Sequence, residues 1–589
     1  MNYKLSTFQS VPDKDKPSPS IWSALRRLTP LLSGEKKTLV ISFFAIIVTS
    51  LSTLVAPIII SHTVDTAIRT HNAHGITLSS LLLAGVFVLG LIASYVQTLS
   101  MGGLGRRVLF SLRNAIFTKL QELPVAFFNE NKAGDLISRI NNDTDKLNQF
   151  FSQALMQFVG SFFLIIGAGI FLVSLKVRLG VAALLPALAV LLITQIISGW
   201  VKRKNTYSLQ TLGGMSAEIQ ESLNNFKVIV AFNRLDYFRE KFNDANKNNY
   251  TASVSAGIAN NIFTPLYGLA SNLAQLVVVA YGIYLIMAGS MTLGLLIGFL
   301  LYVNSFYGPL RQLASVWATL QLALAAFDRI SEVLALETNM PIIAAKQTES
   351  KALLAFENVS FRYTGGKEVL RNINFELEKG KTYALVGPTG GGKTTTASLM
   401  ARLYDPTAGT ILLDGKDIRS YSPEERTKKI GFILQEPFLF TGTIGDNILY
   451  GNQEYRGFSS EQITKVLAEA NLSALVERFS QGLDTKVETS GNSISLGQKQ
   501  LIAFMRAALR KPDLLILDEA TANIDTVTEQ LLGQILDKLP ATTTRVIIAH
   551  RLNTIDKADQ IFFINSGEIT PAGSMQQAVD MLLHGKRSS

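Results

Sequence analysis

Six long apolar stretches constrain the fold of this 589-residue chain more than any other feature of its sequence. They lie at residues 38–61, 78–101, 155–175, 179–200, 263–287 and 293–306. The first five contain no Asp, Glu, Lys or Arg, and each is longer than the roughly 20 residues that a helix needs to cross a bilayer. A charge at the centre of such a helix costs about 3 kcal/mol on insertion. The pattern therefore predicts six membrane-spanning helices, with the sixth continuing as a helix toward Leu336.

The overall composition agrees with a membrane protein and excludes several other classes. Hydrophobic residues make up 48% of the chain, which is high for a soluble protein of this length. The net charge of +10 is spread over short groups rather than long basic runs, so we expect membrane lipid and no nucleic acid among its partners. The chain contains no cysteine, which excludes disulfides and thiolate chemistry.

Basic residues flank the apolar stretches asymmetrically. They precede the first stretch and follow the second and the fourth: Lys36, Lys37, Arg106, Arg107, Lys202, Arg203 and Lys204. Because Lys and Arg accumulate in cytoplasmic loops, we expect an integral protein of a bacterial plasma membrane, the cell inner membrane, with a cytoplasmic N-terminus. Residues 1–20 are polar and rich in Pro and Ser, which predicts a disordered cytosolic leader.

The character of the sequence changes near residue 340. Residues 102–154 and 201–262 have a helical pattern with few Gly or Pro, which predicts helices that extend from the membrane into the cytosol. Further on, short β-branched runs alternate with Gly-rich turns and helical segments, as in an α/β domain. We therefore expect a six-helix transmembrane domain with two long cytosolic loops over 21–340, and a cytoplasmic α/β domain over 341–589.

A phosphate-binding loop stands near the start of the α/β domain. The stretch GPTGGGKT, residues 387–394, follows the apolar TYALV and opens the helical TTTASLM. Glycines let backbone N–H groups approach phosphates at a helix N-terminus, Lys393 offsets phosphate charge, and the Thr394 hydroxyl is a ligand for Mg²⁺. The residues predicted to bind nucleotide here are Gly387, Pro388, Thr389, Gly390, Gly391, Gly392, Lys393, Thr394 and Thr395. The expected fold class is an α-helical six-span transmembrane domain followed by an α/β P-loop nucleotide-binding domain.

An acidic pair ends a second apolar strand. The stretch LLILDEA, residues 514–520, places Asp518 and Glu519 at the carboxyl end of this strand, where ligands bind in parallel sheets. We expect Asp518 to hold Mg²⁺ through a water, and Glu519 to polarise the water that attacks the terminal phosphate. ATP and Mg²⁺ are therefore the expected cofactors.

Five further motifs accompany the P-loop, and together they resemble a known family. FRYTGG with Tyr363, ILQEP with Gln435, ISLGQ at 494–498, LDEATANID at 517–525 and AHRL with His550 occur in the order found in the nucleotide-binding domains of ABC transporters. The membrane half resembles the exporter type, because FFNENKAGDLISRINND at 127–143 and FKVIVAFNRLDYF at 226–238 are similar to its coupling loops. The resemblance covers residues 20–580.

The resemblance implies a role for each matched residue. Tyr363 would stack on adenine, Gln435 would bind Mg²⁺ or sense the attacking water and contact the coupling helices, and His550 would contact the γ-phosphate. A packing tyrosine, a polar loop residue and a strand-end histidine with satisfied hydrogen bonds are the alternatives at these positions. Glu519, His550 and Gln435 would be the catalytic residues, while Asp525 would lie at a dimer interface.

The signature turn departs from the family pattern at one position. In the family it reads L-S-G-G-Q, opens a helix, and points its serine and backbone amides at the γ-phosphate of ATP held by the opposite subunit. The matching residues are Ser495, Gly497 and Gln498. Leu496 replaces the first glycine, and its side chain would obstruct a close approach of backbone to phosphate.

Two explanations of Leu496 remain open. Either a homodimer tolerates it at two ordinary sites, or the chain is one subunit of a heterodimer with one consensus and one degenerate ATP site. Heterodimeric exporters of this family often pair a subunit that has an intact catalytic glutamate and switch histidine but an altered signature with a subunit of the reverse pattern. Because this chain has Glu519 and His550 beside an altered signature, the resemblance favours the heterodimer. The partner would then be a different half-transporter subunit with an unaltered signature and a weakened catalytic carboxylate.

The expected function is ATP-driven export of a hydrophobic or amphipathic substrate, drug-like or lipid, by alternating access. Uncharged polar residues within the spans suit a small amphipathic substrate, although helix packing explains them equally well: Gln157, Gln195, Asn272, Gln275, Tyr281, Tyr302 and Asn304. A homodimeric lipid or peptide exporter and an ATP-gated channel or regulatory subunit are the alternatives.

Overall fold

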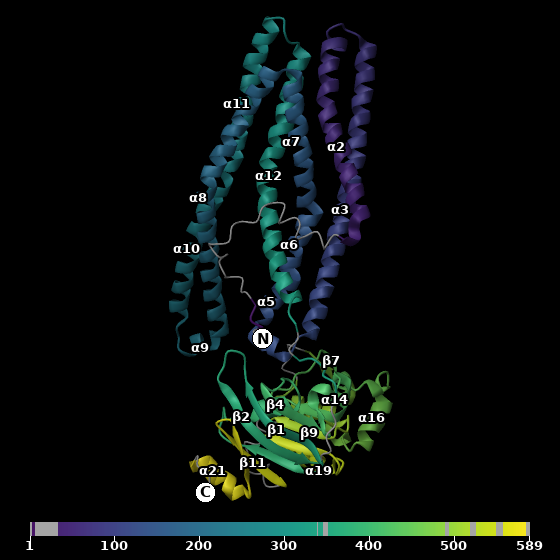
Figure 1. Ribbon diagram of the computed structural model, residues 1–589, viewed down its shortest axis with the longest axis vertical. Coiled ribbons are helices and arrows are strands. Elements are labelled where there is room, and N and C mark those ends of the chain that lie inside the picture. Colours follow the sequence, from purple (N-terminus) through teal and green to yellow (C-terminus); the bar gives the residue numbers. More distant parts are fainter. Residues whose placement is uncertain are drawn as a thin grey trace. The chain divides into compact units, whose positions relative to one another are not determined.

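The computed structural model describes residues 3–5, 33–337, 340–345, 351–488, 494–518, 526–548 and 558–584 (Figure 1). The chain separates into two compact units. The membrane unit comprises Leu5–Gln121 and Asn131–Leu336, and the ATPase-like α/β unit comprises Met1–Lys4, Glu122–Glu130 and Glu337–Ser589. A short segment from the first half of the chain, Glu122–Glu130, thus packs with the α/β unit.

Among the residues that the structure describes, six helical stretches are long and apolar enough to cross a membrane, which confirms the prediction of six spans. Their apolar parts lie in α2 (Lys36–Thr63), α3 (Ala73–Glu122), α7 (Leu155–Leu175), α8 (Val177–Asn224), α11 (Phe263–Met287) and α12 (Leu293–Leu334). A π-helical turn, η2 (Val64–Ile68), follows α2. The sixth span is longer than its predicted core because its helix continues without a break to Leu334.

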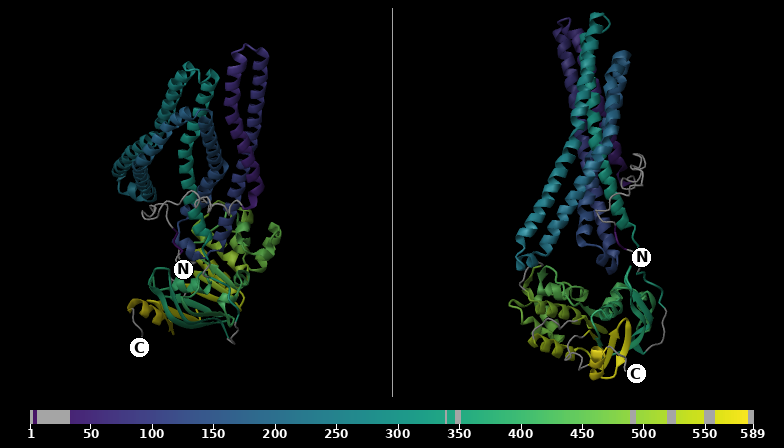
Figure 2. Two further views of the ribbon diagram at one scale, coloured as in Figure 1. Left: turned by 45° about the horizontal axis from the view of Figure 1, so that its top comes forward. Right: turned by 90° about the vertical axis from the view of Figure 1, so that its left-hand side faces the viewer.

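The two predicted cytosolic extensions are helical. One contains the second half of α3 and the short elements α4 (Val125–Glu130), α5 (Ala133–Ser138), η3 (Arg139–Asp143), α6 (Thr144–Gln149) and η4 (Phe150–Ala154). The other contains the end of α8, the short α9 (Phe226–Ala231) and α10 (Leu235–Asn261). Figure 2 shows α8 and α10 side by side from two directions, and paired amide hydrogen bonds of 2.8 and 2.9 Å between Asn205 and Asn260 join them.

Several polar side chains within the spans serve helix packing. The Tyr302 hydroxyl is buried and donates to the carbonyl oxygen of Leu54 at 2.6 Å, and its ring stacks on Phe171. Gln275 donates through Nε2 to Asn304 Oδ1 at 3.0 Å. Packing between helices therefore explains why Tyr302, Gln275 and Asn304, three of the seven polar residues noted in the spans, are polar.

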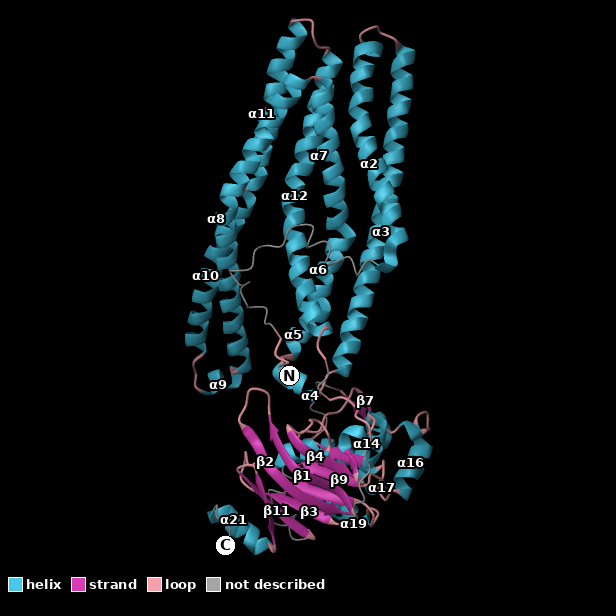
Figure 3. Cartoon of the chain, in the orientation of Figure 1, coloured by secondary structure: helices cyan, strands magenta, loops and turns pink. Residues whose placement is uncertain are grey.

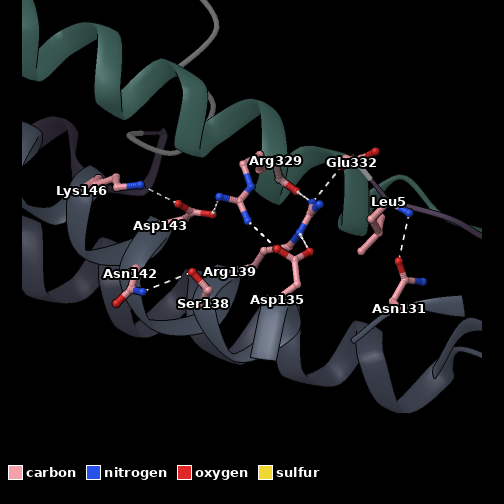
Figure 4. Close-up of polar contacts among 10 residues, drawn as sticks. All are labelled: Leu5, Asn131, Asp135, Ser138, Arg139, Asn142, Asp143, Lys146, Arg329 and Glu332. Atoms are coloured by element: carbon pink, nitrogen blue, oxygen red, sulfur yellow. Dashed lines mark hydrogen bonds and ion pairs between the residues drawn. The ribbon is translucent and has the colours of Figure 1, made fainter. Parts of the chain in front are cut away.

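A network of charged residues joins the first helical extension to the end of α12 (Figure 4). Arg139 is completely buried and contacts Asp135 at 3.2 Å, Glu332 at 2.8 Å and the carbonyl oxygen of Arg329 at 2.6 Å. Arg329 in turn pairs with Asp135 at 2.9 Å and with Asp143 at 3.3 Å. Several carboxylates thus surround two guanidinium groups, which offsets the cost of removing both from water.

The α/β unit confirms the predicted fold class (Figure 3). One antiparallel sheet has the order β2-β1-β4-β5, and a six-stranded, mainly parallel sheet has the order β12-β11-β3-β10-β9-β6. The strands are β1 (Ala352–Arg362), β2 (Glu368–Glu378), β3 (Thr382–Val386), β4 (Ala408–Leu413), β5 (Lys416–Asp417), β6 (Ile430–Ile433), β7 (Gly442–Thr443), β8 (Lys486–Val487), β9 (Leu514–Asp518), β10 (Thr544–Ile548), β11 (Gln560–Asn565) and β12 (Glu568–Ala572).

The main helices of the α/β domain are α13 (Lys393–Met400), α14 (Pro423–Lys429), α15 (Ile444–Leu449), α16 (Ser460–Glu469), α17 (Ser473–Val476), α18 (Leu496–Ala508), α19 (Thr526–Lys538) and α21 (Met575–His584). Most of them contribute to two main hydrophobic cores, but α21 packs in a separate cluster and α14 buries no residue. The core between the two sheets contains α13, whereas a second core contains α15 to α19. The P-loop helix and the helix of the signature turn therefore lie in different cores.

Residues 3–5 lie within the stretch that we expected to be a disordered leader. In the structure, Tyr3 and Leu5 are buried and both backbone N–H groups donate hydrogen bonds. The two side chains are apolar and differ in this respect from the polar residues around them in the sequence. Residues 6–20 lie outside the part of the chain that the structure describes.

Replacing Arg139 tests the charged network. Arg139→Met should lower the stability of the purified protein by on the order of 3 kcal/mol, because it leaves carboxylates without their buried partner. A clear fall in the thermal unfolding midpoint in detergent would show this. The control is Arg107→Met, because Arg107 pairs with Glu35 at 2.6 Å on the surface and its loss should change the midpoint little. Equal losses in the two variants would contradict the prediction.

Candidate functional site

The P-loop has a backbone that only glycine allows. The loop runs from the end of β3 to the start of α13, and Gly387, Gly390 and Gly392 have φ values of 147°, 81° and 116°. A Cβ on Gly387 would come within 2.0 Å of the carbonyl oxygen of Ile564. Larger residues would therefore be strained and would also push apart the loop and β11.

Lys393 and Thr394 begin the helix that follows the loop. The Lys393 ammonium donates to the carbonyl oxygens of Gly387 at 2.9 Å and Pro388 at 3.1 Å, so it lies over the loop. Thr394 donates through Oγ1 to Asp518 Oδ1 at 3.4 Å. Asp518 is buried at the end of β9. A hydroxyl beside a buried carboxylate at the edge of a phosphate-binding loop is an oxygen-ligand pair that fits Mg²⁺.

Strand pairing brings Gln435 to the same end of the sheet as Asp518. In the parallel register, Ile548 pairs with Asp518, and Ile433 pairs with Leu517. Gln435 is exposed two residues beyond Ile433 and therefore follows the strand next to Asp518. Three predicted residues, Glu519, Asp525 and His550, lie outside the described residues.

Tyr363 lies beside the P-loop helix. Its hydroxyl forms a 3.0 Å hydrogen bond with the Thr395 hydroxyl, and its ring packs edge-on against Phe361 and Tyr404. The side chain remains 38% exposed. A partly exposed aromatic ring held next to a phosphate-binding loop is suited to stacking on a nucleotide base.

Tyr404 was not identified from the sequence. Asn129 of α4 donates through Nδ2 to the Tyr404 hydroxyl at 2.6 Å, while the Tyr404 ring contacts Tyr363 at 5.3 Å. Burial raises the pKa of Tyr404 and Tyr363 raises it further, while the hydrogen bond from Asn129 opposes both effects. Tyr404 thus links α4 to the predicted adenine contact. The only signal in the sequence was an aromatic residue shortly after the P-loop helix.

The signature turn is a helix N-terminus closed by its own side chains. Ser495 Oγ accepts from the backbone N–H of Gln498 at 3.2 Å, and the Ser495 N–H donates to Gln498 Oε1 at 3.0 Å. Leu496 is the first residue of α18 and is 39% exposed. Because this position is helical, it does not require the left-handed backbone of glycine. The leucine therefore fits the turn without backbone strain. Its side chain affects only how closely another group, such as a phosphate, can approach the helix N-terminus.

A cavity of about 260 Å³ lies beside Gln435 in the α/β unit. Apolar residues and two arginines contribute to its lining, among them Phe432, Leu434, Phe438, Phe440, Tyr450, Arg506 and Arg510. Arg506 of α18 donates to the carbonyl oxygens of Asn447 at 2.8 Å and Phe438 at 3.2 Å, and burial lowers its pKa. Arg506 thus connects the signature helix to the segment that follows Gln435.

Comparisons with known proteins agree with this geometry. Residues 39–310 match the family model of the ABC transporter transmembrane region, and residues 370–522 match that of ABC transporters. YfiC of Bacillus subtilis (strain 168), an uncharacterized ABC transporter ATP-binding protein, is 33% identical over 563 residues, which cover 94% of this chain and 92% of the relative.

Two further relatives carry more specific names. A multidrug resistance ABC transporter ATP-binding and permease protein of Lactococcus lactis subsp. lactis (strain IL1403) is 33% identical over 512 residues, or 86% of each chain. A fatty acid ABC transporter ATP-binding/permease protein of Mycobacterium tuberculosis (strain CDC 1551 / Oshkosh) is 34% identical over 469 residues, covering 80% of this chain and 74% of the relative.

A solved structure shows the same fold. The structure of a bacterial Atm1-family ABC exporter with ATP bound aligns with a TM-score of 0.78 at 24% identity, covering 94% of this chain and 99% of that chain. Six spans, one nucleotide-binding domain and full-length relatives above 30% identity lead to one conclusion. The chain belongs to the ABC transporter family, as an exporter half-transporter whose ATPase is coupled to transport.

Proposed function

We propose that this half-transporter exports a hydrophobic or amphipathic compound, using ATP hydrolysed at a site that it completes with a second, different subunit. The observation that supports the proposal is that, within one chain, the phosphate-binding residues and the predicted signature turn lie in different cores. The P-loop, Thr394 and Asp518 form one cluster, whereas Ser495 and Gln498 bond to each other at the start of a helix in the other core. A signature turn of this kind is available to a nucleotide bound by another subunit.

The described residues can position ATP and Mg²⁺. The P-loop amides and Lys393 would hold the phosphates, and Tyr363 would stack on the adenine. Thr394, Asp518 (through a water) and Gln435 would hold Mg²⁺, which offsets the charge of the phosphates when bound. Glu519 would orient and polarise the attacking water, His550 would contact the γ-phosphate, and Asp525 would lie at the subunit interface.

Replacing Tyr363 tests the adenine contact. Tyr363→Ala should raise the KM for ATP about tenfold, because stacking of a base on an aromatic ring contributes on the order of 1–3 kcal/mol. Tyr363→Phe retains the ring and should bind ATP nearly as well, although it loses the hydrogen bond to Thr395. Steady-state ATPase assays of the purified complex measure both values. The same KM in the alanine variant and the parent would contradict the adenine role.

Replacing Glu519 tests the catalytic assignment. Glu519→Gln should abolish ATP turnover while ATP binding and closure of the nucleotide-binding domains persist, because the amide cannot polarise the water. Phosphate release and binding of a fluorescent ATP analogue separate the two effects. The control is Glu454→Gln, an exposed carboxylate in the same domain. Substantial turnover in Glu519→Gln would disprove this role.

The altered signature supports a heterodimer. An exposed leucine at the first position of α18 would narrow the approach of a phosphate to the helix N-terminus, so the site closed by this chain's signature would be the slow one. The partner would supply an unaltered signature to the site that contains Glu519. Its own catalytic carboxylate would be weakened.

Restoring the glycine distinguishes a heterodimer from a homodimer. In a heterodimer, Leu496→Gly should change turnover little, because the weakened carboxylate of the partner still limits that site. In a homodimer, each site would contain both Leu496 and Glu519, so the same substitution should raise turnover severalfold. The measurement is kcat for ATP of the purified complex, with subunit composition determined by mass spectrometry. A severalfold increase would contradict the heterodimer.

The short helix α9 provides a second reason to expect a partner. Its apolar side chains, and those next to it, are largely exposed in the single chain: Phe226, Val228, Val230 and Phe232. An exposed apolar group of this kind marks a contact surface. In a partner with the same fold, the cavity beside the residue that corresponds to Gln435 would accommodate these apolar side chains of α9.

The substrate class is proposed from the spans and from two relatives. The first five predicted spans lack charged residues, which favours a hydrophobic or amphipathic compound over a strongly charged solute. The Lactococcus lactis relative is named for multidrug resistance and the Mycobacterium tuberculosis relative for fatty acids. We therefore propose a drug-like or lipid substrate, moved from a cytoplasmic side that contains the N-terminus and the ATPase domain.

A further inference from the structure

We call residues 3–5 the strap: Tyr3 lies against α4, and Leu5 contacts Asn131. Tyr3 and Leu5 are 1% and 5% exposed. The Leu5 N–H donates to Asn131 Oδ1 at 3.0 Å, a contact visible in Figure 4. Tyr3 and Leu5 are thus both buried and both hydrogen-bonded through their backbone N–H groups, which indicates a specific contact rather than chance proximity.

Tyr3 makes three contacts with two separate parts of the chain. Its N–H donates to Glu130 Oε2 at 3.0 Å, and its ring packs edge-on against Phe127, with centroids 6.3 Å apart. Its hydroxyl donates to the carbonyl oxygen of Glu337 at 3.1 Å. One tyrosine therefore contacts both α4 and the segment that follows α12.

The short helix α4 depends on such contacts. It has six residues, and isolated helices of this length are not stable in water. Phe127 is completely buried, and Tyr3 is one of its aromatic neighbours. On the same short helix, Asn129 donates to Tyr404, next to the predicted adenine contact. The strap and Tyr404 therefore hold α4 through different residues.

The two parts joined by Tyr3 are the places where the chain passes between its two units. Residues 123–130 follow α3 and Glu337 follows α12, and both stretches belong to the α/β unit. A displacement of the α/β unit is therefore transmitted along the chain to α3 through α4, and to α12 through Glu337. A contact between α4 and Glu337 would make these two connections move together.

We propose that Tyr3 is a positioning residue for energy coupling. Because Tyr3 joins α4 to Glu337, the segment that follows α3 and the segment that follows α12 move together when the α/β unit binds ATP. This inference rests on the proposed ATP-driven transport cycle. Tyr3 takes no part in nucleotide binding, so its loss should separate hydrolysis from movement of the membrane helices.

The test uses the absence of cysteine, which lets two spin labels be placed without background. Cysteines replace His74 in the first turn of α3 and Ser290 in the turn between α11 and α12. Both labels are on this chain, so the measurement does not depend on the identity of the partner. Pulsed electron paramagnetic resonance gives the distance between them, with and without ATP and vanadate, in the purified full-length complex, and ATPase rates are measured on the same samples.

In Tyr3→Ala, we expect at least half of the parent ATPase rate but less than half of the ATP-dependent change in label distance. Tyr3→Phe retains the ring and loses the hydroxyl contact with Glu337, so it should show a smaller loss of the distance change and a normal ATPase rate. The control is Tyr250→Ala, which removes an exposed ring on α10 and should behave as the parent.

Three outcomes would overturn the inference. A full distance change in Tyr3→Ala would remove the role of Tyr3 while leaving the transport cycle in place. A parallel loss of hydrolysis and distance change in both Tyr3 variants would show that the strap only supports folding. The absence of any ATP-dependent change in the parent would instead contradict the proposed cycle, and the inference with it.

Discussion

The bilayer offers no hydrogen-bond partners to a polypeptide backbone, and this constraint determines the first half of the structure. Continuous helices satisfy it, and in this chain they continue well beyond the apolar region: α3 has 50 residues and α8 has 48. Because a helix rises about 1.5 Å per residue and bends little, such extensions act as rods. The short helices α4 and α9 lie after their ends, where a rod can transmit a displacement.

The nucleotide site obeys a different constraint, namely the close approach of backbone to phosphate. Gly387 has no room for a Cβ, and the left-handed Gly392 directly precedes the helix that begins at Lys393. In the proposed site, contacts continue from the adenine position outward, since Tyr363 contacts Tyr404 and Tyr404 accepts a hydrogen bond from α4. If the proposed adenine contact is correct, only Tyr363 and Tyr404 separate the base from Asn129 of α4.

Features that depend on local sequence were predictable, and those that depend on distant pairing were not. The spans, the P-loop and the strand that ends at Asp518 each have a short pattern set by periodicity or backbone geometry. The contacts of Arg139 with Glu332, of Asn129 with Tyr404 and of Tyr3 with Glu337 join residues more than 190 positions apart. The stretch 1–20 was interpreted as a disordered leader because its composition is polar, but composition does not reveal that Tyr3 has an apolar neighbour in Phe127.

The sequence alone determined the family, the six spans and the presence of a P-loop ATPase, because each follows from residue types at fixed spacing. It also predicted a signature turn in which Leu496 stands in place of glycine. Only the tertiary structure decided that this leucine begins a helix without backbone strain, and that α4 packs with the α/β unit. The physical reason is that helix starts and buried contacts depend on which surfaces meet, and those surfaces come from segments far apart in the chain.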